Sequence, residues 1–252
     1  SLIRCLVDQG HTVFCISWKN PGVDERELDM DDYLELGFFD ALEAINAIVP
    51  GQKVHATGYC LGGTLLAIAA AAMDRDGDAR LGSMTLFTAQ TDFTEPGELA
   101  LFIDESEVSL LEAQMAETGF LTAGQMAGAF QLLRSNDLLW SRIVGEYLMG
   151  ERAAMNDLMA WNADATRMPA RMHSQYLRRL LLNDDLSEGR YPVRGKPVSL
   201  TTAEFHLVHV LAQRAGRVLG REQLLQLLHG TADEAFDRSI ARSMSWSPAC
   251  AR

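Results

Sequence analysis

The sequence predicts an α/β protein with a parallel sheet, and three observations lead to this fold class. Strand-like and helix-like segments alternate over residues 11–90. The predicted strands are short apolar runs, which are typical of strands buried in a parallel sheet. One strand runs directly into a glycine-flanked cysteine, Gly58-Tyr59-Cys60-Leu61-Gly62, and a helix of small apolar residues follows. The complete prediction is a partial parallel sheet, a helical cap region, and a separate helical segment at the C-terminus.

The elements of the sheet region follow one another in a regular order. Residues 1–9 resemble the end of a helix, and Gly10 is its expected stop. Residues 12–18 are rich in β-forming side chains and predict the first strand. A helix is expected from Asp31 to Ile48, because its apolar residues keep helical spacing. The remaining expected elements are a strand over 53–59, a helix over 63–73 and a strand over 82–89.

Composition narrows the class of protein. The 252 residues carry a net charge of −12, so the chain as a whole is not a nucleic-acid binder by its electrostatic field. The four cysteines form no C-x-x-C pair and no disulfide framework, which suits a reducing cytoplasm. The longest apolar run, residues 61–73, is too short to span a bilayer. Because the chain begins at Ser1 inside an apparent helix, we expect it to be a fragment.

The turn around Cys60 is the candidate chemical site. Glycines two residues before and after the cysteine allow the strand and the helix to cross closely. The helix N-terminus offers backbone N–H groups that favour a thiolate or an oxyanion. A buried structural cysteine or a phosphate-binding loop would also fit the motif. A phosphate loop usually brings a Lys-Ser/Thr pair, which is missing here, so we favour a nucleophile.

Four segments resemble a known family. They are Gly58-Tyr59-Cys60-Leu61-Gly62-Gly63-Thr64 and residues 88–93, 135–140 and 156–169. They resemble class I poly(3-hydroxyalkanoate) synthases, which have the α/β-hydrolase fold, and the resemblance covers residues 1–198. It implies a core over 1–94 with a nucleophile elbow and a helical cap over 95–198. It also implies that Cys60 accepts the acyl group and that the backbone N–H of Leu61 is an oxyanion donor.

The same resemblance implies substrate, partners and location. The family transfers (R)-3-hydroxyacyl groups from CoA thioesters to a growing polyester chain. It uses no separate cofactor, since coenzyme A is part of the substrate. It implies a homodimer formed through the cap, and a location in the cytoplasm or at the surface of polyester granules.

The chain departs from the family after the cap. The family's Asp-His pair and Gly-Gly-His turn do not occur in this sequence. The histidines that follow Cys60 are His173, His206, His209 and His229. We interpret His173 as a surface or core-edge residue. Asp92 is a weak alternative for the catalytic acid that orients the base. Without the Asp and His, this chain is an acyltransferase by resemblance that we expect to be inactive alone.

The C-terminal segment resembles a different family. Residues 197–240 are similar to the winged-helix DNA-binding domain of response regulators. The resemblance is carried mainly by Leu200-Thr201-Thr202-Ala203-Glu204-Phe205. The basic half of the recognition helix and the wing are absent. We therefore expect a chimeric chain with an incomplete winged-helix segment over 199–240 and a disordered tail over 241–252. A DNA-binding module is the alternative function, and DNA binding is not expected.

Overall fold

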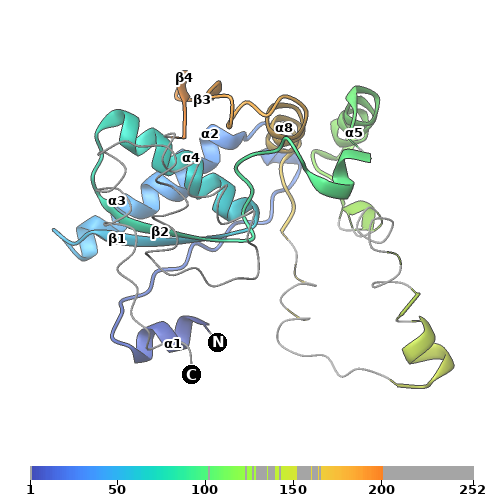
Figure 1. The fold of residues 1–252 in the computed structure, drawn as a ribbon, viewed down its shortest axis with the longest axis horizontal. Coiled ribbons are helices and arrows are strands. Elements are labelled where there is room, and N and C mark those ends of the chain that lie inside the picture. The colour runs from blue at the N-terminus through green and yellow to red at the C-terminus, as the bar shows by residue number, and fades with distance from the viewer. Residues whose placement is uncertain are drawn as a thin grey trace, which may run out of the picture. The chain divides into compact units, whose positions relative to one another are not determined.

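The computed structural model describes residues 2–200 with short gaps (Figure 1). The gaps are residues 102, 123, 127, 129–134, 136–139, 142, 152–159, 161–163 and 165. The described residues form two compact units. The first contains residues 2–16, 34–92 and 185–200, and the second contains residues 17–33 and 93–184. The predicted winged-helix segment and tail lie outside the described residues, apart from residues 199 and 200.

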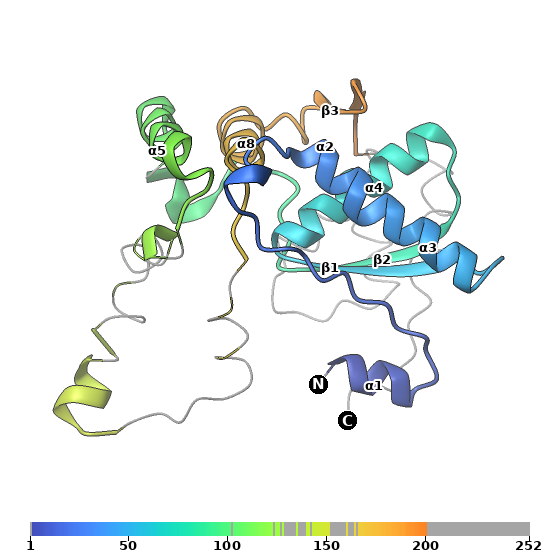
Figure 2. The same ribbon diagram turned by 180° about the vertical axis from the view of Figure 1, so that it is seen from behind.

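The first unit holds the parallel strands. Strand β1 (Val54–Tyr59) pairs in parallel with β2 (Leu81–Phe87), and helix α4 (Leu61–Asp76) connects them. The predicted strands over 53–59 and 82–89 and the crossover helix are therefore confirmed. In both views α3 (Asp40–Ile48) and α4 lie on the same side of the strand pair (Figures 1 and 2). The parallel strands and helices of this unit confirm the predicted α/β fold class.

The expected helix over 31–48 is present but is not a uniform α-helix. It begins at α2 (Met30–Asp32), continues as a π-helical stretch η2 (Tyr33–Phe39) and ends as α3. The Asp29 side chain caps it by accepting the N–H of Asp32 at 3.2 Å. The apolar spacing therefore predicted its extent correctly, while the local widening to the π form has no signal in that spacing.

The first predicted strand is wrong. Residues 11–20 carry no strand assignment, and nearly all of their side chains are exposed. A strand exists only when a neighbouring chain segment supplies its hydrogen bonds. Within the described part of the chain, β1 pairs with β2 and no element pairs with residues 12–18. The segment does have the composition of a β-strand, but composition alone does not provide a neighbouring strand to pair with.

Helix α1 (Leu2–Asp8) agrees with the expected helix end at the start of the chain, and Gly10 follows it with a φ of +89°. None of its residues is buried. This positive φ is the left-handed conformation that glycine adopts readily at helix ends.

A C-terminal hairpin returns to cover α4. Strands β3 (Tyr191–Val193) and β4 (Lys196–Val198) pair antiparallel, and β4 packs on α4. The two turn residues, Arg194 and Gly195, have φ values of +53° and +69°. Two positive φ values are the requirement of a type I′ hairpin turn. Helix α4 thus packs on β1 and β2 as well as on this hairpin, and ten of its 16 residues are buried.

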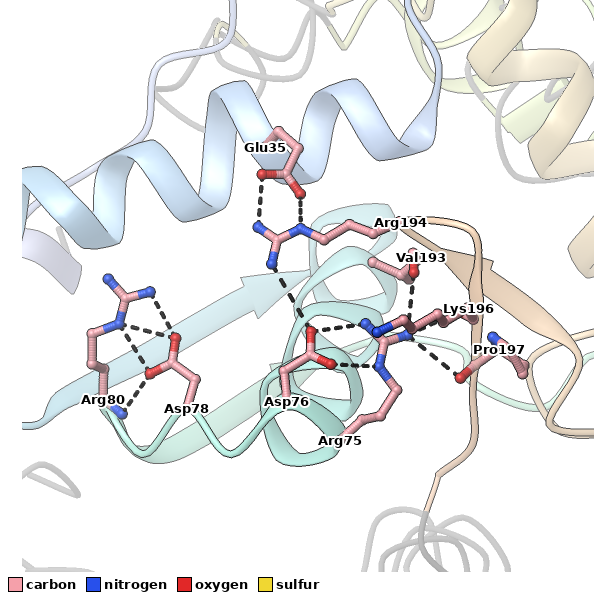
Figure 3. Close-up of polar contacts among 9 residues, drawn as sticks. All are labelled: Glu35, Arg75, Asp76, Asp78, Arg80, Val193, Arg194, Lys196 and Pro197. Atoms are coloured by element: carbon pink, nitrogen blue, oxygen red, sulfur yellow. Dashed lines mark hydrogen bonds and ion pairs between the residues drawn. The ribbon is translucent and has the colours of Figure 1, made fainter.

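Two arginines fasten the hairpin to the rest of the first unit (Figure 3). The Arg75 guanidinium donates to the Lys196 carbonyl at 2.9 Å and to the Val193 carbonyl at 3.1 Å. Arg194 pairs with Glu35 and lies 4.4 Å from the centroid of the Phe39 ring. These contacts hold the ends of both strands of the hairpin.

Asp76 links the two arginines (Figure 3). Its carboxylate lies 2.8 Å from Arg75 and 3.9 Å from Arg194. The hydrogen bond from Arg75 is the main cause that lowers the pKa of the Asp76 carboxyl below its usual range. Exposed pairs of this kind each stabilise a fold only weakly, but here several charges form one network.

The second unit is built mainly from helical turns. Its named elements are η1 (Val23–Glu25), α2, η3 (Gly97–Leu101), α5 (Glu105–Thr118), η5 (Ile143–Leu148), α8 (Ala170–Gln175) and η6 (Tyr176–Leu182). Helix α5 packs on α8 and η6. Arg178 joins these elements through Glu112 at 2.7 Å and Glu105 at 2.8 Å. The helical character expected after residue 95 is present here, while the predicted domain boundaries stay a prediction.

None of the described helices combines sufficient length with sufficient hydropathy to span a membrane.

Candidate functional site

Cys60 lies where β1 ends and α4 begins. Its backbone has φ 50° and ψ −124°, a conformation that non-glycine residues rarely adopt. Cys60 is a free, exposed cysteine. A side chain held in a strained turn between a strand and a helix is the arrangement of a nucleophile elbow. The structure thus places Cys60 where the sequence motif predicted it, and its role as a nucleophile stays a prediction.

Two glycines make the sharp turn possible. A Cβ atom added to Gly58 would lie 2.5 Å from the Gly63 Cα atom. A Cβ atom added to Gly63 would lie 2.4 Å from the Ala89 Cβ atom. Gly62, by contrast, has open space around the corresponding position. The close crossing of strand and helix therefore depends on Gly58 and Gly63, and Gly62 is not needed for it.

The N-terminus of α4 supplies backbone donors beside the thiol. The Cys60 carbonyl accepts the N–H groups of Gly63 at 2.9 Å and Thr64 at 3.2 Å, which closes the first turn. Leu61 is the first residue of the helix, and the first N–H groups of a helix have no acceptor within it. The position of Leu61 therefore suits an oxyanion donor, and this role also stays a prediction.

The loop after β2 is bonded to the turn at Cys60. The Cys60 N–H donates to the Phe87 carbonyl at 2.9 Å. The Thr64 hydroxyl donates to the Gln90 carbonyl at 2.7 Å. Thr88, between these anchors, has a φ of +48°. Sequence reasoning missed this second strained residue, because no composition signal marks a threonine with positive φ.

The histidine on β1 does not reach the thiol. His55 lies on β1 five residues before Cys60, which corresponds to roughly 16 Å along a strand. Its Nδ1 atom forms a hydrogen bond with the Ser83 hydroxyl at 2.8 Å. His206, His209 and His229 lie outside the described residues. Asp92 follows β2 at the same sheet edge as Cys60 and is half-buried.

His173 belongs to the second unit and is buried, with 4% of its surface exposed. The surface alternative of the interpretation as a surface or core-edge residue was therefore wrong. It fails because α8 faces the interior of the unit with both Met172 and His173. Burial lowers the pKa of the His173 imidazole to about 4. A ring with this pKa is a weak proton acceptor at neutral pH.

The buried His173 predicts a loss of stability in mild acid. Between pH 6.5 and pH 4 the unfolded imidazole binds a proton that the folded one does not, so the free energy of unfolding decreases as the pH falls. A shift of this size corresponds to roughly 3 kcal/mol. Urea unfolding at pH 7 and pH 5 covers part of this window and is expected to show a difference of about 2 kcal/mol. His173→Leu is expected to reduce the difference between the two pH values, and His11→Asn at an exposed position is expected to retain it. An unchanged difference in His173→Leu contradicts the prediction.

No group of three or more histidine, cysteine, aspartate or glutamate residues in the described ranges is arranged to hold a metal ion.

Comparison with known proteins adds a family and several relatives. The sequence profile of the alpha/beta hydrolase fold matches residues 1–245. Poly(3-hydroxyalkanoate) polymerase of Methylorubrum extorquens is 46% identical over 190 residues, which are 75% of this chain and 31% of the relative. Poly(3-hydroxyalkanoate) polymerase subunit PhaC of Rhizobium meliloti is 44% identical over 200 residues, which are 79% of this chain and 33% of the relative. The poly(3-hydroxyalkanoate) polymerase subunit PhaC of Cupriavidus necator is 37% identical over 210 residues, which are 81% of this chain and 36% of the relative. The chain spans about a third of the length of these curated relatives.

Proposed function

We propose that this chain, which belongs to the α/β-hydrolase fold family, carries the acyl-accepting site of a poly(3-hydroxyalkanoate) polymerase. The observation that carries the proposal is Cys60, an exposed thiol in a strained turn at the N-terminus of α4. The relatives named poly(3-hydroxyalkanoate) polymerase support the choice of substrate class. The substrate is an (R)-3-hydroxyacyl-CoA thioester, and coenzyme A is the leaving group rather than a cofactor.

The proposed step exchanges one thioester for another. The Cys60 sulfur attacks the thioester carbonyl carbon, and a new carbon–sulfur bond forms. The bond between that carbon and the CoA sulfur breaks, and the CoA thiolate takes up the proton released by the Cys60 thiol. The step is near energy-neutral, so the acyl group stays reactive toward the hydroxyl of a growing polyester chain. The Leu61 N–H would stabilise the negative charge on the carbonyl oxygen.

The acyl-transfer step is tested directly with (R)-3-hydroxybutyryl-CoA. We expect the intact 252-residue chain to acquire a slow, single acyl adduct, which is detected by mass spectrometry together with release of free CoA. Cys60→Ala is expected to lose the adduct. Cys15→Ala removes another exposed cysteine and is expected to keep it. An adduct of equal size in Cys60→Ala would overturn the proposal.

The proposal extends to assembly and location on the basis of the family resemblance alone. A homodimer through the cap region is expected to double the mass measured by sedimentation. Association with polyester is expected to bring the chain down with isolated granules in a centrifugation assay. A monomer that stays in the supernatant contradicts both expectations.

The proposed chimera predicts that the C-terminal segment does not read DNA. The sequence from residue 237 onward provides only the first turn of a recognition helix, and its basic side chains are Arg238 and, just beyond the segment, Arg242. Sequence readout requires several side chains on base edges together with phosphate contacts from a positive face. In a gel-shift assay at about 100 mM salt, we expect no preference for one duplex over a scrambled control. A sequence-dependent shift that Arg238→Ala removes would restore the DNA-binding alternative.

A further inference from the structure

Thr88 lies directly beside Cys60 at the edge of the parallel sheet. Tyr59 and Phe87 are register partners, and Cys60 and Thr88 are the residues that follow them on the two strands. Neighbouring strands are about 4.8 Å apart, so the two backbones are still adjacent at this point. Both residues are exposed. The Thr88 side chain is therefore available to a molecule that reacts with the thiol.

The backbone of Thr88 is unusual in the same way as that of Cys60. Their φ values are +48° and +50°. Among the non-glycine residues with positive φ in the described ranges, Thr88 is the β-branched one, and branching at Cβ makes this conformation especially unfavourable. Glycine would adopt it without strain. Residues of this kind persist where the surrounding structure fixes them, and they cluster at functional sites.

The loop that carries Thr88 has little freedom to move relative to the thiol. The Phe87 carbonyl accepts the Cys60 N–H on one side of Thr88. The Gln90 carbonyl accepts the hydroxyl of the buried Thr64 on the other side. Between them, Ala89 occupies the space that the absent Cβ of Gly63 leaves. The position of Thr88 is thus set by the same contacts that shape the turn at Cys60.

We propose that Thr88 is a specificity-determining residue whose side chain, placed beside Cys60 by the paired ends of β1 and β2, limits the bulk of the group that reaches the thiol. The inference rests on the proposed function, since the group it would meet is the acyl chain next to the thioester carbon. Its hydroxyl and methyl groups form the wall of the acyl site at this edge of the sheet. The strained backbone is the cost of keeping a branched side chain at this place.

The test compares Cys60 reactivity toward a small and a bulky reagent. In a variant with Cys5, Cys15 and Cys250 replaced by serine, methyl and benzyl methanethiosulfonate each transfer one alkylthio group to Cys60, which forms a mixed disulfide as the reagent's sulfonyl–sulfur bond breaks and methanesulfinate leaves. Thr88→Gly is expected to raise the benzyl-to-methyl rate ratio at least threefold, and Thr88→Leu to lower it. Thr85→Leu is the matched control, because Thr85 is also exposed on β2 but lies three residues earlier. Its ratio is expected to stay within twofold.

Each outcome decides the proposal. Thr88→Gly removes the strain, so its melting temperature is expected not to fall, and this variant remains informative even where Thr88→Leu does not fold. A ratio that is the same in Thr88→Gly and the parent chain overturns the inference. Acylation of Cys60 by 3-hydroxybutyryl-CoA and 3-hydroxyoctanoyl-CoA tests the proposed function separately from the inference on Thr88. If no adduct forms but the reagent ratio shifts, the proposed function fails while the inference on Thr88 stands.

Discussion

The 252-residue polypeptide is expected to form no measurable polyester from (R)-3-hydroxybutyryl-CoA. Repeated turnover needs a base that activates first the thiol and then the hydroxyl of the incoming acyl group, and an acid that orients this base. In the described part of the chain, His55 lies roughly 16 Å from Cys60 along its strand, and His173 is buried in the second unit with its pKa lowered to about 4. Loss of such a base typically costs about a million-fold in turnover.

The measurement follows polymer turbidity and CoA release over hours, with Cys60→Ala as the blank. A single burst of CoA without polymer is the expected result, because acylation can occur once while the transfer to the next hydroxyl fails. Polymer that is abolished by Cys60→Ala would contradict the prediction. It would direct the search for a base to His206, His209 and His229, which individual substitution by glutamine would test.

The elbow was predictable because its signals are local. A strand ending in Tyr59, glycines at positions 58 and 62, and a run of small apolar residues all lie within a few positions of Cys60. The sequence did not distinguish which glycines are structurally required. Gly62, part of the recognised motif, faces open space, while Gly63 takes the close contact with Ala89. That contact joins residues 26 positions apart and is set by the packing of α4 against the loop after β2.

The features that sequence reasoning missed all depend on distant contacts. Residues 12–18 have the composition of a strand, but no described segment pairs with them. The hairpin of β3 and β4 was not expected, because its turn, Arg194-Gly195, is a weaker hairpin signal than Asn-Gly. Its stabilising contacts also come from Arg75 and Glu35, more than a hundred residues earlier. His173 was misplaced because a single histidine in a short helix carries no information on which side of that helix faces the interior.

Gly58→Ala is expected to destabilise the first unit strongly, while Gly62→Ala leaves it intact. The added Cβ at position 58 would lie 2.5 Å from the Gly63 Cα atom and 2.6 Å from the Gly62 carbonyl oxygen. Both are backbone atoms, so the clash can be relieved only by moving β1 away from α4. Overpacking typically costs 1–3 kcal/mol, and a backbone clash belongs at about the upper end of that range or above it. At position 62 the Cβ meets nothing within 4 Å, and alanine favours a helix over glycine by up to about 1 kcal/mol.

Gly63→Ala provides the discriminating control, because its closest contact is with a side chain and the Gly58 carbonyl oxygen lies further away, at 3.2 Å. The added Cβ would lie 2.4 Å from the Ala89 Cβ, so Ala89→Gly in the same chain removes the atom it strikes. We expect the double variant to recover much of the stability that Gly63→Ala loses, and Ala89→Gly to give no such rescue of Gly58→Ala. Urea midpoints from circular dichroism measure all five variants. Equal midpoints for Gly58→Ala and Gly62→Ala would mean that strand and helix do not cross as closely as the structure shows, and the strained geometry at Cys60 would lose its structural cause.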